Sequence, residues 1–385
     1  MNVELMIDVV CWFCLLACCI TTLMVILNAA LAGKMGQSEV TTTEKPLVSF
    51  LVPVRDEAHN LRHLLPALLN STYKSLEVII LDDGSRDHSA KIAADLMSDA
   101  PFPVRIVAGI PWSQATQLSG KAHACAQLAK VARGEILIFC DADVRPSPMA
   151  IWHTVNMMMK PGTREKMAGL SALPAQSCEG LLERLLIPWV MHLPLLMSLP
   201  LFCSWRLPFK SMQMANGQWI ALFKPDYFAS GGHKSLGVTP LEDVALARQI
   251  QRVTGRGVQP VLAATDISVA MYSDWRATLA GFSKNLVMIG GGTPLVFGCV
   301  VVLVNLVFMF PLWGYFFRPK LALICLVLVL VSRILTAKLF KMPLRDVLLH
   351  PLSLLLFNIA AYKSLRTSLR GSYEWKGRVI KWTPI

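Results

Sequence analysis

The sequence predicts an α/β domain with a mostly parallel sheet, joined to apolar helices near both ends of the chain. Two observations support this prediction. From Val48 onward, short β-branched runs alternate with amphipathic stretches, as strands and helices do in a parallel sheet. In addition, 54% of the 385 residues are hydrophobic and only 16% are charged, which is too apolar for an ordinary soluble domain. Because the apolar excess gathers at the two ends, we expect membrane helices there.

The first apolar segment, Val9 to Ala32, has no charged residue and is long enough to cross a bilayer core of about 30 Å. A signal peptide is the alternative, but the run exceeds a signal's usual apolar core and no basic leader precedes it. The flanking charges are acidic before the segment and basic after it, namely Glu4 and Asp8, then Lys34 and Lys45. The positive-inside rule therefore predicts an external N-terminus and a cytosolic domain after the segment.

Two further spans are expected near the C-terminus, over Leu295 to Phe317 and Leu321 to Leu339, although Arg333 interrupts the second. The segment Leu344 to Tyr362 is also apolar. Its interruptions are Arg345, Asp346 and His350. A third span, a re-entrant segment and a helix lying in the membrane interface remain open for this stretch.

The predicted domain organisation has four parts. These are a transmembrane helix at 1–33, a cytosolic α/β domain at 46–290, a transmembrane region of two to three helices at 294–363 and a basic tail at 364–385. The stretch Thr41 to Lys45 reads as a linker. Within the α/β domain, Leu181 to Phe202 is apolar but contains three prolines, so we expect membrane-surface helices at about 181–203, with a further span as the alternative.

A formal net charge of +12 is compatible with a nucleic-acid partner. The basic residues, however, lie beside apolar segments and form no strip of alternating aromatic and basic residues. Anionic lipid headgroups are the expected partner, and no nucleic acid is expected. None of the ten cysteines has zinc-ligand spacing in a polar context, and no disulfide is expected in a cytosolic domain.

Acidic motifs follow the expected strands of the α/β domain. The expected strands are Val48 to Val54, Glu77 to Asp82, Val104 to Ala108 and Glu135 to Cys140. Ligands of such sheets bind beyond the carboxyl ends of the strands, where these motifs stand. The first motif is Arg55, Asp56 and Glu57, and the second runs from Asp82 and Asp83 through Gly84 and Ser85 to Asp87. Adjacent carboxylates can accept hydrogen bonds from a ribose or a base, but helix capping and an ordinary turn are the alternatives.

Asp141 and Asp143 follow the very apolar strand that ends at Cys140. Neighbouring carboxylates at a strand exit repel each other, and a divalent cation relieves that repulsion. Oxygen ligands with open coordination positions suit Mg²⁺ or Mn²⁺ bridging to a diphosphate. The pair is therefore predicted to hold a metal ion.

Two more motifs suit a transfer reaction. Lys121, within the run Gly120 to Cys125, opens a helix where its ammonium and free backbone amides could hold phosphate, or simply lie in solvent. Glu242 and Asp243 begin a further helix, and Asp243 is the predicted base that deprotonates an acceptor hydroxyl. Acidic residues that merely favour a helix N-terminus are the alternative.

The motifs PVRDE, LDDGSRD, GKAHAC, CDADV, GGHK and LED, in this order, resemble family 2 glycosyltransferases of the GT-A fold. The resemblance covers about Pro46 to Asn285. The motifs GKAHAC and ASGGHK and the tail from Glu374 to Arg378 resemble more closely the 4,4'-diaponeurosporenoate glycosyltransferases of carotenoid pathways, and more distantly the hopanoid-associated glycosyltransferases.

The resemblance implies roles for individual residues. Glu57 and Asp83 contact the uridine of a UDP-sugar, Lys121 lies near the diphosphate, Asp141 and Asp143 handle nucleotide and metal, and Asp243 is the base. The nucleotide-sugar site implied in this way comprises Pro53, Arg55, Glu57, Asp82, Asp83, Lys121, Asp141, Glu242 and Lys284. It also implies Mn²⁺ or Mg²⁺ as cofactor.

The sequence departs from processive relatives because no Gln-x-x-Arg-Trp motif follows the Glu-Asp pair, and the corresponding region reads Gly281 to Asn285. Lys284 is the predicted replacement for the missing cation on the leaving diphosphate. We therefore expect an inverting, nonprocessive enzyme that moves sugar from a UDP-sugar to a lipid-like acceptor, such as a carotenoid acid or another isoprenoid, at the cytosolic face of the cell membrane. A processive polysaccharide synthase and a non-catalytic membrane scaffold are the alternatives. A carboxylate acceptor would already be ionised, and Asp243 would then position it.

Overall fold

The computed structural model describes residues 3–36, 45–113, 116–178, 180–198, 200–207, 210–239, 241–272, 274–370, 372–375 and 378–381. Most of the expected linker Thr41 to Lys45 and the side chains of the tail beyond 370 lie outside this description. The chain forms two compact units. The sheet unit comprises 32–177 and 201–271, and the helical unit comprises 1–31, 178–200 and 272–385. The expected domain boundaries remain predictions.

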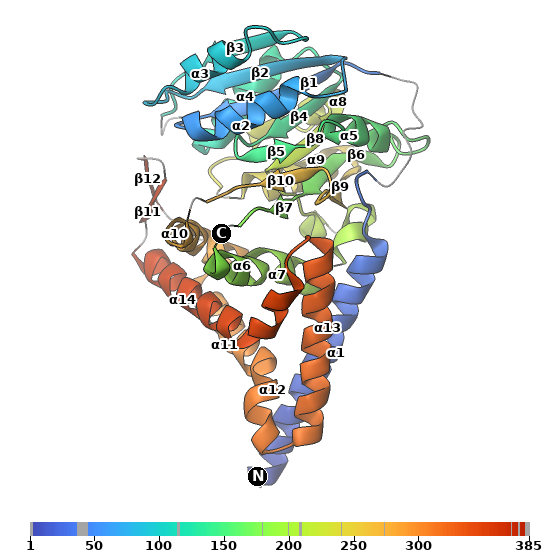
Figure 1. Ribbon diagram of the computed structural model, residues 1–385, viewed down its shortest axis with the longest axis vertical. Coiled ribbons are helices and arrows are strands. Elements are labelled where there is room, and N and C mark those ends of the chain that lie inside the picture. The colour runs from blue at the N-terminus through green and yellow to red at the C-terminus, as the bar shows by residue number, and fades with distance from the viewer. Residues whose placement is uncertain are drawn as a thin grey trace. The chain divides into compact units, whose positions relative to one another are not determined.

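The sheet unit contains a seven-stranded sheet in the order β3-β2-β1-β4-β8-β6-β9 (Figure 1). Its first strands are β1 (Val48–Val54), β2 (Leu76–Asp82), β3 (Val104–Ala108) and β4 (Ile136–Cys140), each within one residue of its expected start. These four strands pair in parallel, so their carboxyl ends share one edge. The expected fold class, a mostly parallel sheet with helices, is confirmed.

Three strands of this sheet were not expected from the sequence, namely β6 (Met167–Leu173), β8 (Trp219–Phe223) and β9 (Gly257–Leu262). Strand β8 runs antiparallel to both β4 and β6, whereas β6 and β9 are parallel. A small second sheet joins β5 (Val144–Pro146), β10 (Ile267–Val269) and β7 (Ala175–Gln176). The helices of this unit are α2 (Ala58–Leu69), α3 (Ser89–Leu96), α4 (Gly120–Val131), α5 (Ala150–Met158), α8 (Lys224–Ala229) and α9 (Glu242–Thr254).

Both faces of the main sheet are covered, which explains why its strands are almost continuously apolar. Successive side chains of β1 point to opposite faces, so Phe50 and Val52 join one core while Leu51 joins the other. The ring of Phe50 meets that of Trp219 on β8 edge to face, with centroids 5.3 Å apart. This aromatic contact ties the antiparallel strand to the parallel half of the sheet.

One buried carboxylate lies within the sheet. Glu77 on β2 accepts hydrogen bonds from the Ser49 hydroxyl (2.5 Å) and the Arg133 N–H (2.6 Å), and the guanidinium of Arg105 lies 2.9 Å away. Burial opposes ionisation of this group, but these three partners together outweigh burial and hold the pKa of Glu77 below its ordinary value. Glu77 therefore links β1 and β2 to the segment that enters β4.

The helical unit holds α1 (Val3–Leu31), α6 (Leu181–Ile187), α7 (Leu193–Ser198), α10 (Trp275–Ile289), α11 (Pro294–Phe308), α12 (Phe310–Trp313), α13 (Pro319–Leu339) and α14 (His350–Leu369). Within the described residues, three helical segments are long and apolar enough to cross a membrane, namely 3–31, 319–339 and 344–369. The stretch Leu181 to Phe202 is helical from Leu181 to Ser198, where a π-helical turn at Pro188–His192 joins α6 to α7, and a 3₁₀ turn begins at Leu201.

The expected span Leu295 to Phe317 is bent, because α11 and the segment Phe310–Phe316 meet at an angle of 44°. Pro311 stands in the first turn after the break, where it lacks an N–H to continue the helix of α11. The segment is therefore either a broken span or a re-entrant loop.

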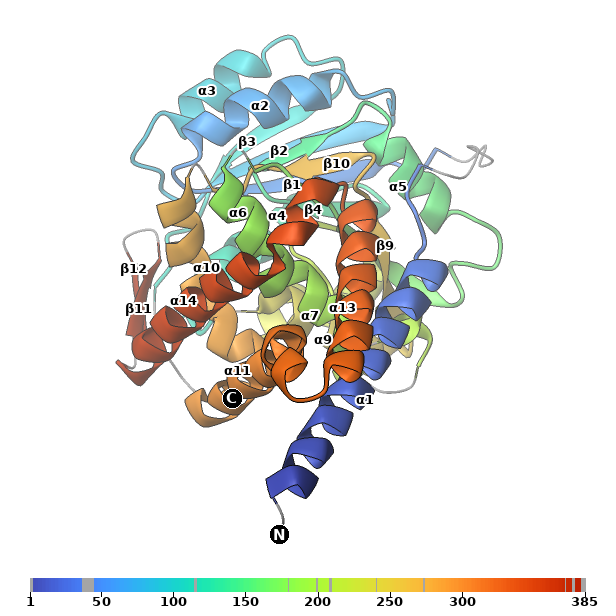
Figure 2. The same cartoon turned by 60° about the horizontal axis from the view of Figure 1, so that its bottom comes forward.

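Helices α1 and α13 lie side by side and point the same way (Figure 2). Asp8 pairs with Arg318 at 2.6 Å, and further along Ser332 donates a hydrogen bond to Thr22 at 3.0 Å. The start of α13 therefore lies beside the start of α1. Because α12 leads directly into that end, the bent pair carries the chain to the start of α13.

Helix α14 runs back along α11. His350 contacts the Phe308 carbonyl oxygen (3.0 Å), Asn358 bonds Asn305 (2.7 Å), and the hydroxyl of Ser364 accepts the Val287 N–H (3.2 Å). Residue numbers rise along α14 while those of the contacted residues fall, so α14 runs antiparallel to α11 and ends beside α10. The segment therefore runs from beside α13 toward α10, and the three alternatives for its placement in a membrane remain predictions.

Replacing Glu77 by Gln removes the ionised acceptor from a buried network, and we expect the free energy of unfolding to fall by about 2–4 kcal/mol. Thermal unfolding of the purified chain in detergent measures this loss. Because the folded pKa of Glu77 is lowered, its contribution is complete above the ordinary value of 4.5 and disappears as pH falls through the folded pKa. The exposed Glu135→Gln is the matched control, and equal stability of the two variants would contradict the account.

Candidate active site

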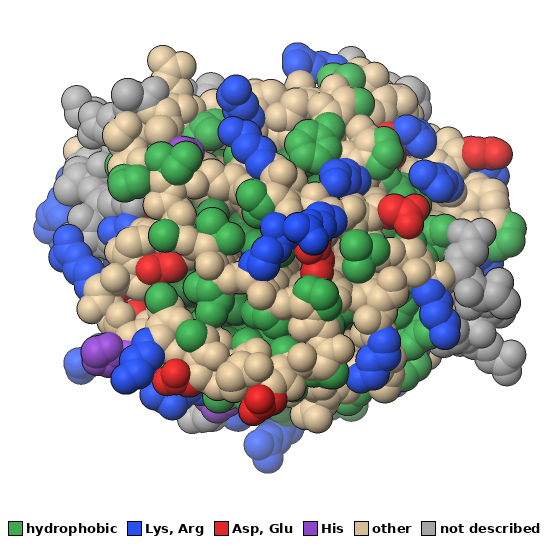
Figure 3. All heavy atoms as spheres, turned by 90° about the horizontal axis from the view of Figure 1, so that it is seen from above, with side chains coloured by type: hydrophobic (Ala, Val, Ile, Leu, Met, Phe, Trp, Pro, Cys, Tyr) green, Lys and Arg blue, Asp and Glu red, His purple; other side chains and the backbone are tan. Residues whose placement is uncertain are grey.

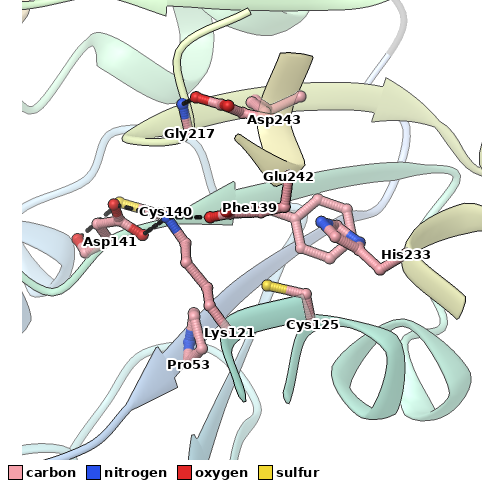
Figure 4. A pocket seen from close by; sticks show the side chains of 11 residues that line it. Pro53, Lys121, Cys125, Phe139, Cys140, Asp141, Gly217, His233, Glu242 and Asp243 are labelled. Atoms are coloured by element: carbon pink, nitrogen blue, oxygen red, sulfur yellow. Dashed lines mark hydrogen bonds and ion pairs between the residues drawn. The ribbon is translucent and has the colours of Figure 1, made fainter. Parts of the chain in front are cut away.

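A cleft lies at the carboxyl edge of the main sheet (Figure 4). Its empty space is about 270 Å³, including the open mouth. The polar residues that line it come from strand ends and helix starts, and they are Lys121, Asp141, His233, Glu242 and Asp243, together with Pro53 and Gly217. Four of the predicted nucleotide-sugar residues and the predicted base are therefore brought together within the sheet unit.

Lys121 stands at the centre of this cleft, in the first turn of α4. Its ammonium lies 2.7 Å from a carboxylate oxygen of Asp141 and 3.5 Å from one of Glu242. Burial lowers the pKa of Lys121, but Asp141 and Glu242 raise it well above its ordinary value. The lysine is thus charged and already paired, so the alternative of a solvated lysine at a helix start does not describe it.

Glu242 and Asp243 place two carboxyl groups beside that ammonium. Burial raises the pKa of Glu242 to about 7, with Lys121 opposing the rise and Asp243 adding to it. Burial also raises the pKa of Asp243. Two acids with raised pKa values beside one cation form a site where a proton can be held near neutral pH.

Both oxygens of Asp243 are fixed by backbone amides. One accepts the Gly217 N–H and the other accepts the Val244 N–H, each at 2.8 Å. Because it accepts the Val244 N–H, Asp243 stabilises the N-terminus of α9, which was the structural alternative for this residue. Each carboxylate oxygen retains further lone-pair capacity, however, so the group remains able to accept a proton.

Gly217 was not foreseen as a site residue. A methyl group in place of its α-hydrogen would lie 3.0 Å from the Lys121 ammonium and 3.4 Å from an Asp243 oxygen. Only a residue without a side chain lets the backbone approach both charged groups this closely. The sequence around Gly217 carries no signal of this role, because the two neighbours come from distant parts of the chain.

Asp141 and Asp143 follow β4, as expected for the metal pair. Asp143 is half-buried, and one of its oxygens is buried with no hydrogen-bond partner among the described residues. Burial, and then the neighbouring Asp141 and Glu57 carboxylates, raise the pKa of Asp143 to about 7. An orphaned, crowded carboxylate of this kind fits an oxygen ligand for Mg²⁺ or Mn²⁺.

The protein supplies only part of such a coordination shell. Within the described residues, no group of three or more His, Cys, Asp or Glu side chains could hold a metal ion. Mg²⁺ and ions like it commonly bind through one or two carboxylates, with substrate phosphates and water completing the shell. The pair at β4 matches that pattern, so a metal ion would bind here together with a diphosphate.

Arg55 and Asp83 form the far corner of this edge, where β1 and β2 end. The Arg55 guanidinium donates to the Asp83 carbonyl oxygen at 2.7 Å and lies 3.8 Å from its carboxylate. Asp83 is buried and its N–H donates to the Val54 carbonyl at 2.8 Å. Asp82 instead serves the turn, because its carboxylate accepts the Ser85 N–H at 3.0 Å.

Helix capping was the alternative role for the acidic residues of the first motif, and Glu57 does not cap α2. The first amides of α2 are bonded by side chains of the neighbouring turn: Asp87 accepts the Ala58 N–H and the Ser89 hydroxyl accepts the Glu57 N–H, both at 2.9 Å. Glu57 makes no side-chain cap. Its carboxylate instead accepts a hydrogen bond from Asn60 at 2.7 Å.

His233, in the GGHK motif, has a structural role. Its ring contacts the Tyr227 hydroxyl at 3.0 Å and packs edge to face on Phe139, with centroids 4.8 Å apart. Burial, and then the charge of Lys121, lower its pKa to about 3, so it is neutral and supports the wall of the cleft. The segment forms a 3₁₀ turn at Gly232–Ser235. The remaining predicted site residue, Lys284, lies on α10 in the helical unit, and its role stays a prediction.

Comparisons with known proteins bear on this site. Residues 49–164 match the family model described as glycosyl transferase family 2. A 4,4'-diaponeurosporenoate glycosyltransferase of Staphylococcus haemolyticus (strain JCSC1435) is 25% identical over 53% of this chain and 52% of its own length. A dolichol-phosphate mannosyltransferase of Mycosarcoma maydis is 31% identical over 32% of this chain and 42% of its own. The chain thus spans about half the length of the curated relatives it matches.

A solved structure is similar over nearly the whole chain. The mannosyltransferase from Pyrobaculum calidifontis in complex with GDP-Man and Mn²⁺ aligns with a TM-score of 0.54 and 16% sequence identity. The alignment covers 94% of this chain and 99% of that one. At this identity the likeness establishes the fold.

Replacing Gly217 by Ala should weaken the binding of a nucleoside diphosphate in this cleft while leaving the fold intact, because the new methyl group would displace the Lys121 ammonium and the Asp243 carboxylate. Titration of the purified protein with a nucleoside diphosphate and Mn²⁺ measures the effect, and we expect binding at least about tenfold weaker. Gly298→Ala, at a position with open space around it, is the control. Equal binding by both variants would show that the close approach at Gly217 does not matter.

Proposed function

Because residues 49–164 form a family 2 glycosyltransferase domain on a GT-A fold, we propose that the chain transfers a single sugar from a nucleoside diphosphate sugar to a lipid-like acceptor, with inversion at the anomeric carbon. The expected family and fold are thereby confirmed. The observation that carries the proposal is the meeting of Lys121, Asp141 and Asp243 in one cleft of a chain that also has membrane-length helices. A scaffold without chemistry gives no reason for this cluster.

The proposed reaction is one in-line displacement. Asp243 accepts the proton of an acceptor hydroxyl, whose oxygen then forms a bond to the anomeric carbon. The bond from that carbon to the phosphate oxygen breaks, and its electron pair leaves with the nucleoside diphosphate. Lys121, released from Asp141 or shared with it, stabilises the charge on this leaving group. Asp141 and Asp143 would hold Mn²⁺ or Mg²⁺, which supplies further positive charge to the diphosphate.

The nucleotide base would bind at the corner formed by Arg55, Asp83 and Glu57. The resemblance of the motifs favours UDP, whereas the solved relative from Pyrobaculum calidifontis holds GDP-Man. Carboxylates at this corner accept hydrogen bonds from N–H groups, which both uracil and guanine possess. We propose that the base is uracil. Transfer from GDP-sugars in place of UDP-sugars would show that it is guanine.

The proposed acceptor is an isoprenoid acid or a similar lipid. Two relatives are named for such molecules, a carotenoid acid in one case and dolichol phosphate in the other. An acceptor whose attacking oxygen is already ionised needs no base, and Asp243 would then orient it. Lys284, the proposed cation for the leaving diphosphate, would act from α10.

The proposed location is the cytosolic face of the cell membrane. Residues 32 onward follow the C-terminal end of α1, and the end of α13 lies at that same end of the helical unit, since the two helices are parallel. The re-entrant reading of α14 returns the chain there too. Positive charges at Lys34 and Lys45, and at Arg366 and Arg370 near the end of α14, then fall on one side, as the positive-inside rule requires of the cytosol.

No nucleic-acid partner is proposed, as expected from the sequence. Figure 3 shows one face of the molecule, where Lys and Arg side chains are interspersed with acidic and apolar ones. Such a mixed surface differs from the basic strips that track a phosphate backbone. Lipid headgroups remain the proposed partner of the basic residues near the apolar helices.

The proposal is tested by transfer of radiolabelled sugar from several UDP- and GDP-sugars into a membrane lipid extract, with Mn²⁺ or with EDTA. We expect one organic-soluble product that requires the metal ion. Asp243→Asn should lower the rate by about 10²- to 10⁴-fold for a hydroxyl acceptor. The exposed Asp99→Asn is the matched control.

Labelled insoluble polymer would favour a processive polysaccharide synthase instead. No transfer from any donor would contradict the proposal. A normal rate in Asp243→Asn, with a carboxylate product, would assign Asp243 to positioning.

A further inference from the structure

A second cavity lies wholly within the helical unit. Its empty space is about 280 Å³, including its mouth. It is lined by apolar side chains such as Pro188 and Val347 and by four polar ones, Arg184, Arg333, Thr336 and Asp346. No part of the transfer reaction accounts for these residues.

Arg333 is the unusual member of this group. Only 4% of its surface is exposed, although it lies on a helix long and apolar enough to span a membrane. One of its terminal nitrogens donates to the Ser353 hydroxyl at 3.2 Å, while its Nε and its other terminal nitrogen have no hydrogen-bond partner among the described residues. Charged groups inside a membrane span are costly and generally mark a functional site.

The charges around the cavity do not balance. Asp346 already accepts a hydrogen bond from Arg184 at 2.7 Å, and Arg345 also lies 4.0 Å from its carboxylate. No carboxylate of the described residues lies within ion-pair distance of Arg333. Arg333 also faces inward rather than reaching outward to the membrane surface, so snorkelling does not explain its position.

The depth of Arg333 points to a lipid headgroup. It lies six residues before the C-terminal end of α13, or about 9 Å along the helix. That end of α13 lies with the C-terminal end of α1, as the parallel pairing shows. Apolar walls around a guanidinium fork suit an oxyanion that carries an acyl or isoprenoid chain.

We propose that this cavity binds the anionic head, a phosphate or a carboxylate, of a lipid-like molecule, with Arg333 as its main ligand and Thr336 beside it. The bound oxyanion supplies the counter-charge that Arg333 lacks. The inference does not rest on the proposed transfer reaction, since a protein inactive in transfer would still bind such a lipid.

The test is thermal unfolding of the purified full chain in detergent, titrated with phosphatidylglycerol, phosphatidylcholine or oleate. A ligand that binds only the folded state raises Tm as its concentration rises. We expect phosphatidylglycerol or oleate to raise Tm and phosphatidylcholine not to do so. Response to phosphatidylglycerol identifies a phosphate head, and response to oleate alone identifies a free acid.

The decisive variant is Arg333→Met, which keeps the volume and removes the charge. We expect an apparent affinity for the anionic lipid at least about tenfold weaker, with the lipid-free Tm unchanged or higher, because a buried unmatched charge is removed. Lys338→Gln, which removes an exposed charge from the same helix, should respond like the wild type. If Arg333→Met does not fold, Arg333→Lys replaces it, with a weakened response expected.

An Arg333 variant that responds like the wild type would overturn the proposal. Equal stabilisation by phosphatidylcholine, or no response of the wild type to either anion, would overturn it as well. A lower lipid-free Tm with the lipid response intact would assign Arg333 to the structure of the helical unit alone.

Discussion

The ion pair between Lys121 and Asp141 is the interaction on which the candidate active site depends. Acidic side chains gather at the carboxyl edge of the sheet, among them Glu57, Asp141, Asp143, Glu242 and Asp243, and three of these have raised pKa values. Without a cation these groups would repel one another in a buried place. Lys121 matches one charge at 2.7 Å and approaches a second at 3.5 Å. The remaining negative charge is what makes a divalent metal ion chemically reasonable there.

Much of the sheet unit follows from its sequence. The strands β1 to β4 begin within one residue of their expected positions, because each is a short apolar run followed by a turn and an amphipathic helix. Strands β6, β8 and β9 were missed, because they belong to the part of the sheet where β8 reverses direction and the strand-helix alternation breaks down. The pattern of a parallel sheet therefore predicts the strands β1 to β4 better than the rest of the sheet.

Some residues of the candidate site could likewise be predicted from the sequence, and others could not. Lys121, Asp141 and Asp243 could be predicted because each stands directly after a strand or at the start of a helix. Gly217 could not, since its importance arises only where α4 and α9 approach the same point in space. Likewise, Asp87 and Ser89 bond amides 29 and 32 residues earlier in the chain, and no local motif announces such a contact.

In the helical unit, hydropathy predicts where the apolar segments lie but not how they bend or pack. Hydropathy identified every apolar segment, but it gave neither the bend before Pro311 nor the return of α14 along α11. Both depend on contacts between segments: Asp8 with Arg318 orients α13, and Asn305 with Asn358 orients α14. In the sequence, Arg333 only interrupts an apolar segment, whereas in the structure its side chain lines a cavity.

The central claim is that Lys121 binds the diphosphate of the donor in competition with Asp141. Calorimetric titration of a nucleoside diphosphate with Mn²⁺ into Lys121→Met, compared with Lys130→Met from the exposed side of the same helix, tests it most directly. The account predicts binding at least about tenfold weaker for Lys121→Met and unchanged for Lys130→Met. Wild-type affinity in Lys121→Met would contradict it.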